Sequence, residues 1–148
     1  MTLSRVARFQ RDDGVVGSYL HHNGQVGVLV EVQGPGGDGL AGLAREVALH
    51  IAHADPIGVS EADIAPELID RERRIAGEQV AAEGKPEAIR PKIVEGKVKK
   101  FVAERTLLSQ AFVKDPSKTV GALVKEAAKG LGGAVTVTRF ARFKVGEA

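Results

Sequence analysis

The 148-residue sequence contains no cysteine and no tryptophan, with only one tyrosine and five phenylalanines. Without cysteine it can form neither a disulfide nor a thiolate site, a pattern typical of a reducing compartment. It also has no signal-peptide core and no apolar run near the length of a membrane span. Hydrophobic residues make up 43% of the chain, which allows a core of aliphatic side chains. We therefore expect a soluble, cytoplasmic protein.

Three stretches near the N-terminus have the residue pattern of strands, namely 5–10, 15–21 and 26–33. The clearest is 26–33, in which every second residue is a valine. Asp12-Asp13-Gly14 marks one turn, and Asn23-Gly24 is the strongest short signal for a β-hairpin. These stretches predict an antiparallel meander.

Helical patterns flank this sheet. Residues 40–54 have an amphipathic face that could cover it, and residues 60–63 resemble a helix-capping box. After a connector at 109–116, Ser117 is expected to cap a helix that continues to Leu131. Residues 134–145 predict a long final strand, with one side formed by Val135, Val137, Ala141, Phe143 and Val145.

The most distinctive stretch, residues 66–105, contains two helical patterns separated by a break at 83–86. Pro66 suits the first turn of a helix, and Gly84 suits the position just after a helix end. Pro91 is expected in the first turn of the second helix, after a short lead-in. Each arm has a narrow apolar stripe, which favours an antiparallel, coiled-coil hairpin. Ile75, Ile93 and Phe101 of these stripes are the expected dimerisation residues of the hairpin.

The charges of the two arms are complementary. Residues 66–83 have five acidic and three basic residues, a net charge of −2, whereas residues 86–105 have three acidic and six basic residues, a net of +3. Within the arms, favourable pairs four residues apart are Glu67 with Arg71, Asp70 with Arg74, and Glu95 with Lys99.

These patterns predict an α+β fold: a small antiparallel sheet covered by helices, with an inserted antiparallel helical hairpin. The expected divisions are a core subdomain at 1–56, a dimerisation-type hairpin at 57–110, and a helix and return strand at 111–148 that complete the core.

Three motifs that suggest chemistry have simpler explanations. Residues 34–39 satisfy the GxGxxG pattern of dinucleotide sites, but they follow an antiparallel strand and lack a second parallel one, so we expect a flexible connector. His50 and His53 are too few for a zinc site and are better explained as packing or solvent-facing side chains. The basic residues Lys97, Lys99 and Lys100 are expected to form a solvated helix face, because nucleic-acid binding needs a larger basic excess.

Tyr19, His21 and His22 cluster at the tip of the predicted hairpin, beside Asn23. No GxSxG turn accompanies Ser18, which argues against a nucleophile. Partner contact and strand-end packing explain the cluster equally well. No residue pattern predicts a catalytic, cofactor or metal site.

Taken together, the motifs of this sequence resemble those of bacterial translation elongation factor Ts. The resemblance runs in order from Arg5 to the C-terminus and rests on GVVGSYLHHNGQVGVLVEV, VALHIA, GKPEAI, KIVEGKVKKF, AFVKDPSKTVGALVKEA and VTRFARFKVGE. It implies a factor that binds elongation factor Tu and releases its GDP without covalent chemistry or a cofactor. It also implies a homodimer through the hairpin, and it implies neither a membrane nor a nucleic acid as partner.

The resemblance further implies roles for particular residues. His21 corresponds to the tip histidine of the family, with Tyr19, His22 and Asn23 around it. Lys118, Val120, Leu123 and Val124 correspond to the C-terminal module that contacts elongation factor Tu. Two family features, the N-terminal ubiquitin-associated-like domain and a Thr-Asp-Phe-Val motif, have no match in the sequence. We therefore expect weakened exchange or, alternatively, a dimerisation or scaffold module without exchange activity.

Overall fold

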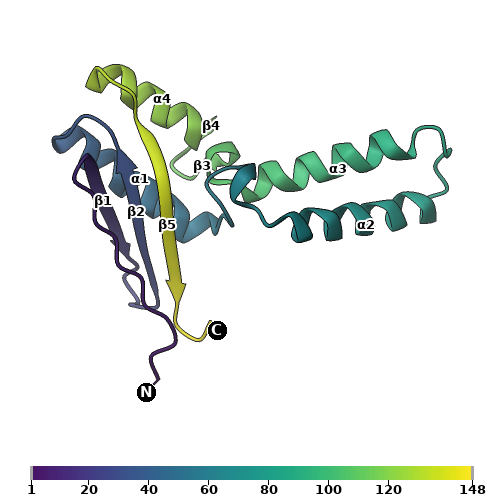
Figure 1. Cartoon of the computed structure of the whole chain (residues 1–148), viewed down its shortest axis with the longest axis horizontal. Coiled ribbons are helices and arrows are strands. Elements are labelled where there is room, and N and C mark those ends of the chain that lie inside the picture. Colours follow the sequence, from purple (N-terminus) through teal and green to yellow (C-terminus); the bar gives the residue numbers. More distant parts are fainter. Residues whose placement is uncertain (1, 148) are drawn as a thin grey trace. The chain divides into compact units, whose positions relative to one another are not determined.

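A three-stranded antiparallel sheet is the centre of the first of two units in the computed structural model, which describes residues 2–147. This unit contains residues 1–55 and 111–148, and the second contains residues 56–110. The sheet order is β1-β2-β5, and the helix α1 packs on β1 and β2 (Figure 1). The strands and helix are β1 (Gly14–Leu20), β2 (Val26–Gln33), β5 (Thr136–Lys144) and α1 (Asp38–Ala54). The α+β fold class is confirmed.

The turn between β1 and β2 forms where the sequence predicts it. Gly24 has a φ of 69°, a conformation that glycine adopts without steric cost. The N–H of Gly24 donates to the carbonyl of His21, and the Asn23 side chain accepts from the N–H of Gln25. These local bonds explain why Asn-Gly is an effective hairpin signal at this site.

The core of this unit lies between the sheet and α1. The alternating valines of β2 point toward the helix: Val28, Val30 and Val32 are buried. Facing them, the buried residues of α1 recur at helical spacing and include Leu40, Leu43, Ala44, Val47, Ala48 and Ile51. Gly17 of β1 lies against Ala44, where an added Cβ would be 2.7 Å from the Ala44 backbone. Glycine at this position lets strand and helix approach closely.

A β-bulge interrupts the alternation of β5. The pairing with β2 shifts between Glu31 and Val32, so that Val32 pairs with Val137 but Glu31 pairs with Arg139. Val137 consequently faces α1, whereas Ala141 and Phe143 lie on the opposite face. The expected single apolar side of this strand is therefore wrong, because one extra residue reverses the alternation.

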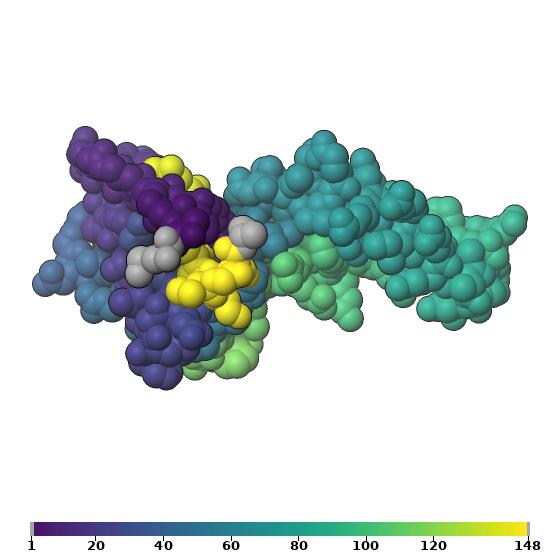
Figure 2. Space-filling view, turned by 90° about the horizontal axis from the view of Figure 1, so that it is seen from below, coloured from purple at the N-terminus to yellow at the C-terminus, as the bar shows by residue number. Residues whose placement is uncertain are grey.

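Residues 5–10 do not form the expected strand. The stretch has no regular secondary structure, and side-chain contacts hold it over the sheet face opposite α1. The guanidinium of Arg5 lies 4.5 Å from the ring centre of Phe143, and that of Arg139 lies 4.1 Å from the ring centre of Phe9. In Figure 2 the N-terminal residues (dark purple) lie against the C-terminal residues (yellow). The loose alternation of apolar and basic residues in this stretch is therefore explained by these arginine–phenylalanine contacts and not by hydrogen bonding of its backbone to a neighbouring strand.

The stretch expected as a connector forms a small hairpin of β3 (Ala111–Phe112) and β4 (Asp115–Thr119). The next helix, α4 (Val120–Leu131), packs against α1 and ends at Gly132, whose φ is 76°. Thr119, not Ser117, caps α4, and its hydroxyl accepts from the N–H of Ala122 at 3.1 Å. Ser117 belongs to β4, where its hydroxyl instead donates to Asp115.

The second unit contains two helices, α2 (Pro66–Ala82) and α3 (Arg90–Arg105), which pack against each other (Figure 1). Pro66 begins α2, Pro91 lies in the first turn of α3, and Gly84 has a φ of 71°, as the sequence predicts. Short 3-10 turns precede and follow them at Glu61–Asp63 and Leu107–Ser109. Buried Ile64, Val98 and Val102 form a small cluster at one end.

The ion pairs of the second unit differ from those predicted. Arg73 pairs with Asp70 at 3.0 Å within α2 and with Glu95 of α3 at 2.9 Å. Lys100 lies 3.9 Å from Glu104. Arg73 can reach both carboxylates because α2 and α3 lie side by side, and sequence spacing alone does not include the neighbouring helix. The description of the pair as a coiled coil stays a prediction.

Candidate partner-binding site

Four aromatic rings from two elements meet at the end of β1. Tyr19 lies in β1, His21 and His22 follow it, and His53 belongs to the last turn of α1. The ring centres of His21 and His22 are 4.2 Å apart, and those of His21 and His53 are 5.9 Å apart. The hydroxyl oxygen of Tyr19 lies 3.1 Å from Nδ1 of His21. We call Tyr19, His21, His22, Asn23 and His53 the histidine tip.

His53 is the member of the histidine tip that sequence reasoning missed. Its neighbour in the sequence pattern, His50, faces the core with 1% of its surface exposed, whereas His53 is exposed. His53 approaches Tyr19, with 6.3 Å between the ring centres. No local signal predicts this contact, because it depends on where the end of α1 crosses the sheet.

The environment of the tip favours the neutral form of His21. Partial desolvation lowers the pKa of His21, and the neighbouring charges of His22 and His53 lower it further. A neutral imidazole has one donor and one acceptor nitrogen, so His21 can offer a directional hydrogen bond to a partner.

His50 has a structural role within the first unit. Its Nδ1 accepts from the N–H of Val113 at 3.1 Å, and its ring stacks on Phe112 with the centres 6.0 Å apart. The interpretation of His50 as a packing residue is confirmed. Within residues 2–147, no three His, Cys, Asp or Glu side chains are arranged to hold a metal ion.

The glycine-rich loop at 34–39 connects β2 to α1. Both strands that pair with β2 are antiparallel to it, whereas a dinucleotide site is built on parallel strands. The side chain in the first turn of α1 is the acidic Asp38, which disfavours a phosphate there. This arrangement supports the interpretation as a connector.

The four predicted contact residues near α4 differ in exposure. Val120 and Val124 are 0% and 6% exposed, so they anchor α4 inside the first unit. Leu123 is half-buried, and Lys118 pairs with Glu126 at 2.9 Å, a hydrogen bond that raises the Lys118 pKa. In this conformation only Leu123 and Lys118 of the four can meet a partner directly.

The three predicted dimerisation residues lie on different parts of the helix pair. Ile75 of α2 and Phe101 of α3 line one groove of about 240 Å³, together with Val98. Ile75 is 36% exposed, an apolar side chain only partly covered within the unit. Ile93 is half-buried and lies outside this groove.

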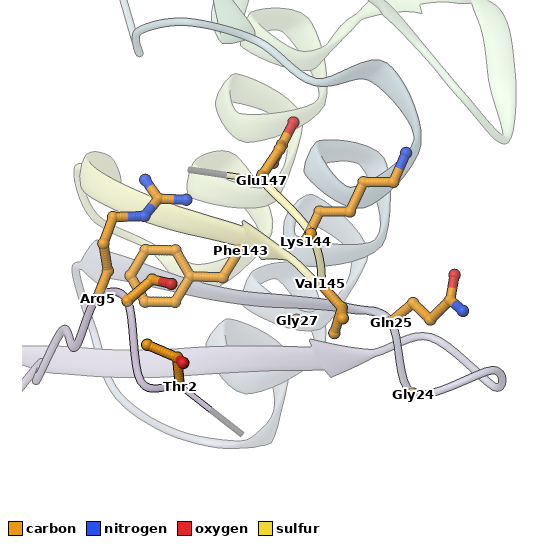
Figure 3. Close-up of a pocket in the computed structure, with 11 residues that line it drawn as sticks. Thr2, Arg5, Gly24, Gln25, Gly27, Phe143, Lys144, Val145 and Glu147 are labelled. Atoms are coloured by element: carbon orange, nitrogen blue, oxygen red, sulfur yellow. The ribbon is translucent and has the colours of Figure 1, made fainter.

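A hollow of about 340 Å³ lies beside the N-terminal segment and the end of β5 (Figure 3). Arg5 lies over the Phe143 ring on one side, and Lys144, Val145 and Glu147 line the other. The guanidinium of Arg5 already covers the aromatic ring of this hollow.

A sequence model of the family described as elongation factor TS matches residues 1–147. The chain belongs to the elongation factor Ts family. It is 42% identical over 153 aligned residues to elongation factor Ts of Bartonella henselae, an alignment that covers 99% of this chain and 50% of that protein. It is 44% identical over 140 residues to elongation factor Ts of Solibacter usitatus, covering 91% and 66% of the two chains. The elongation factor Ts of Clostridium perfringens is 40% identical over 148 residues, covering 99% and 49%.

The chain spans about half the length of most of these curated elongation factor Ts relatives. Membership therefore establishes a translation elongation factor family and leaves the activity of this half to be tested. Among residues 2–147, no helix is both long and apolar enough to cross a membrane.

Proposed function

We propose that the chain binds elongation factor Tu and promotes the exchange of its bound GDP for GTP. The observation that carries this proposal is the family match over residues 1–147, which includes the whole histidine tip. Such a factor changes the shape of its partner's nucleotide site and needs no covalent step. Within the proposal, residues 1–56 and 111–148 form the core that contacts elongation factor Tu.

Residues that are at least partly exposed supply the proposed contacts. At the histidine tip these are the rings of Tyr19, His21 and His22 and the turn residue Asn23. Near α4 they are Lys118 and Leu123, while buried Val120 and Val124 hold the helix in place. Exposed residues on a rigid turn are well suited to recognition because little conformational entropy is lost on binding.

A direct titration tests the binding step. Calorimetry with elongation factor Tu bound to GDP should give saturable association with the unmodified chain. His21→Ala should weaken the affinity at least about fivefold, as expected for the loss of one interface hydrogen bond. Arg8→Ala, an exposed change on the opposite face of the sheet, should bind like the parent. No association at micromolar concentration would refute the proposal.

A second candidate function is a dimerisation or scaffold module that acts through the pair α2 and α3 without exchange activity. The groove that contains Ile75 and Phe101 favours it, because partly exposed apolar side chains are typical of helix interfaces. Light scattering should then give a dimer that Phe101→Asp converts to a monomer. A monomeric parent chain would exclude this candidate.

A further inference from the structure

The histidine tip is held together by hydrogen bonds that determine where the imidazole protons lie. Nδ1 of His53 is 3.0 Å from the carbonyl oxygen of Leu49. Because a carbonyl can only accept, Nδ1 of His53 must carry a proton. This bond fixes the ring of His53 at the end of α1, with its plane at 82° to that of His21.

The hydroxyl of Tyr19 sets the second proton position. The hydroxyl oxygen lies 3.1 Å from Nδ1 of His21. When the hydroxyl donates this hydrogen bond, Nδ1 of a neutral His21 accepts it. The proton of neutral His21 then resides on Nε2, which remains a donor. Loss of the hydroxyl would leave the two neutral forms of His21 close in energy.

We propose that Tyr19 and His53 are positioning residues that hold His21 as a neutral Nε2–H donor and make partner binding sensitive to protons. The ring centres of His22 and His53 lie 4.2 Å and 5.9 Å from that of His21, so the three imidazoles cannot all be protonated without mutual repulsion. This inference rests on the proposed binding of elongation factor Tu and adds to it how the tip is regulated. Protonation turns Nδ1 of His21 from an acceptor into a donor, so the bond with Tyr19 must reverse, and it adds a positive charge beside the rings of His22 and His53.

The other charged groups near this end of the unit compensate one another. The guanidinium of Arg142, in β5, donates to the carbonyl oxygen of Ala52. It also lies 3.5 Å from the carboxylate of Asp55 and 3.9 Å from the carboxylate of Glu147. Because this cation is paired with two carboxylates, the charged neighbours that lower the pKa of His21 are the imidazoles of His22 and His53.

The positioning role can be tested on the full chain without any partner. Two-dimensional NMR of the imidazole groups between pH 5 and 8 should show His21 titrating below an ordinary histidine. His53→Gln should raise the pKa of His21, because it removes a neighbouring charge and part of the desolvation. Tyr19→Phe should move the ¹⁵N shifts of His21 toward a mixture of both tautomers. If neither variant changes His21 while circular dichroism shows intact folding, the inference is refuted.

The binding consequence needs elongation factor Tu. Affinity of the unmodified chain should fall by up to about tenfold per pH unit below the pKa of His21 for each proton that the complex excludes. His53→Gln should shift that pH profile upward. A pH-independent affinity would overturn the inference. Absence of binding at every pH would instead refute the proposed function, while the NMR titration still decides the positioning role.

Discussion

Replacing Gly17 by alanine should destabilise the first unit, because β1 and α1 touch at this glycine. The added Cβ would lie 2.7 Å from both the backbone carbonyl carbon and the Cβ of Ala44. Neither atom can rotate away, so the strand and the helix must separate. Overpacking of this kind costs about 1–3 kcal/mol, and the rigid contacts place Gly17→Ala at the upper end.

The chain offers a matched control in Gly42→Ala. Gly42 lies inside α1 with nothing within 4 Å of an added Cβ. The same chemical change there should stabilise the helix by up to about 1 kcal/mol, since alanine loses less backbone entropy than glycine. The two variants change the unfolded chain equally and differ only in the space available in the fold.

Fluorescence of Tyr19, the sole tyrosine, reports unfolding of the first unit. For a unit of this size, each kcal/mol lost should lower the midpoint of thermal unfolding by about 4–8 °C. Gly17→Ala should melt well below the parent chain and Gly42→Ala at or above it. If Gly17→Ala melts with the parent, the close packing of β1 on α1 is refuted.

Four further substitutions have definite expected outcomes. A hydrogen bond from Arg139 lowers the pKa of buried Glu31, so the stability this carboxylate adds at neutral pH is lost as pH falls through that pKa. Glu31→Gln should therefore lower the urea midpoint at pH 7, and this effect should shrink as the pH falls through that pKa; an effect that does not change with pH would contradict the pairing. Thr119→Ala should cost about 1 kcal/mol and speed amide exchange in the first turn of α4, and unchanged exchange would exclude the cap. Gly77→Ala and Gly96→Ala, with open space at both sites, should each raise helicity and add up to about 1 kcal/mol; destabilisation would show hidden contacts.

Much of the fold could be predicted from local signals. The alternating valines of β2 and the Asn23-Gly24 turn act through neighbouring residues, so the strand 26–33 and its hairpin agree with the structure. The same holds for Pro66, Gly84 and Pro91, whose backbone preferences mark the ends of α2 and the beginning of α3.

The remaining features depend on contacts between residues distant in sequence. Phe9 is held by Arg139 from the last strand, so its segment needs no ladder of its own. The bulge in β5 depends on its pairing with Glu31 and Val32, and it places Val137 on the helix side. At the candidate site, the sequence predicted the residues of the turn but not His53, because its approach depends on packing between α1 and β1.

The proposed function is tested most directly by the release of a fluorescent GDP analogue from elongation factor Tu, because GDP release is the step that an exchange factor accelerates. The release rate is measured with increasing amounts of the chain. We predict release that is faster than the intrinsic rate of elongation factor Tu, saturates with concentration and is slower with His21→Ala. Release at the intrinsic rate with saturating chain present would contradict exchange activity, even if the calorimetric titration showed binding.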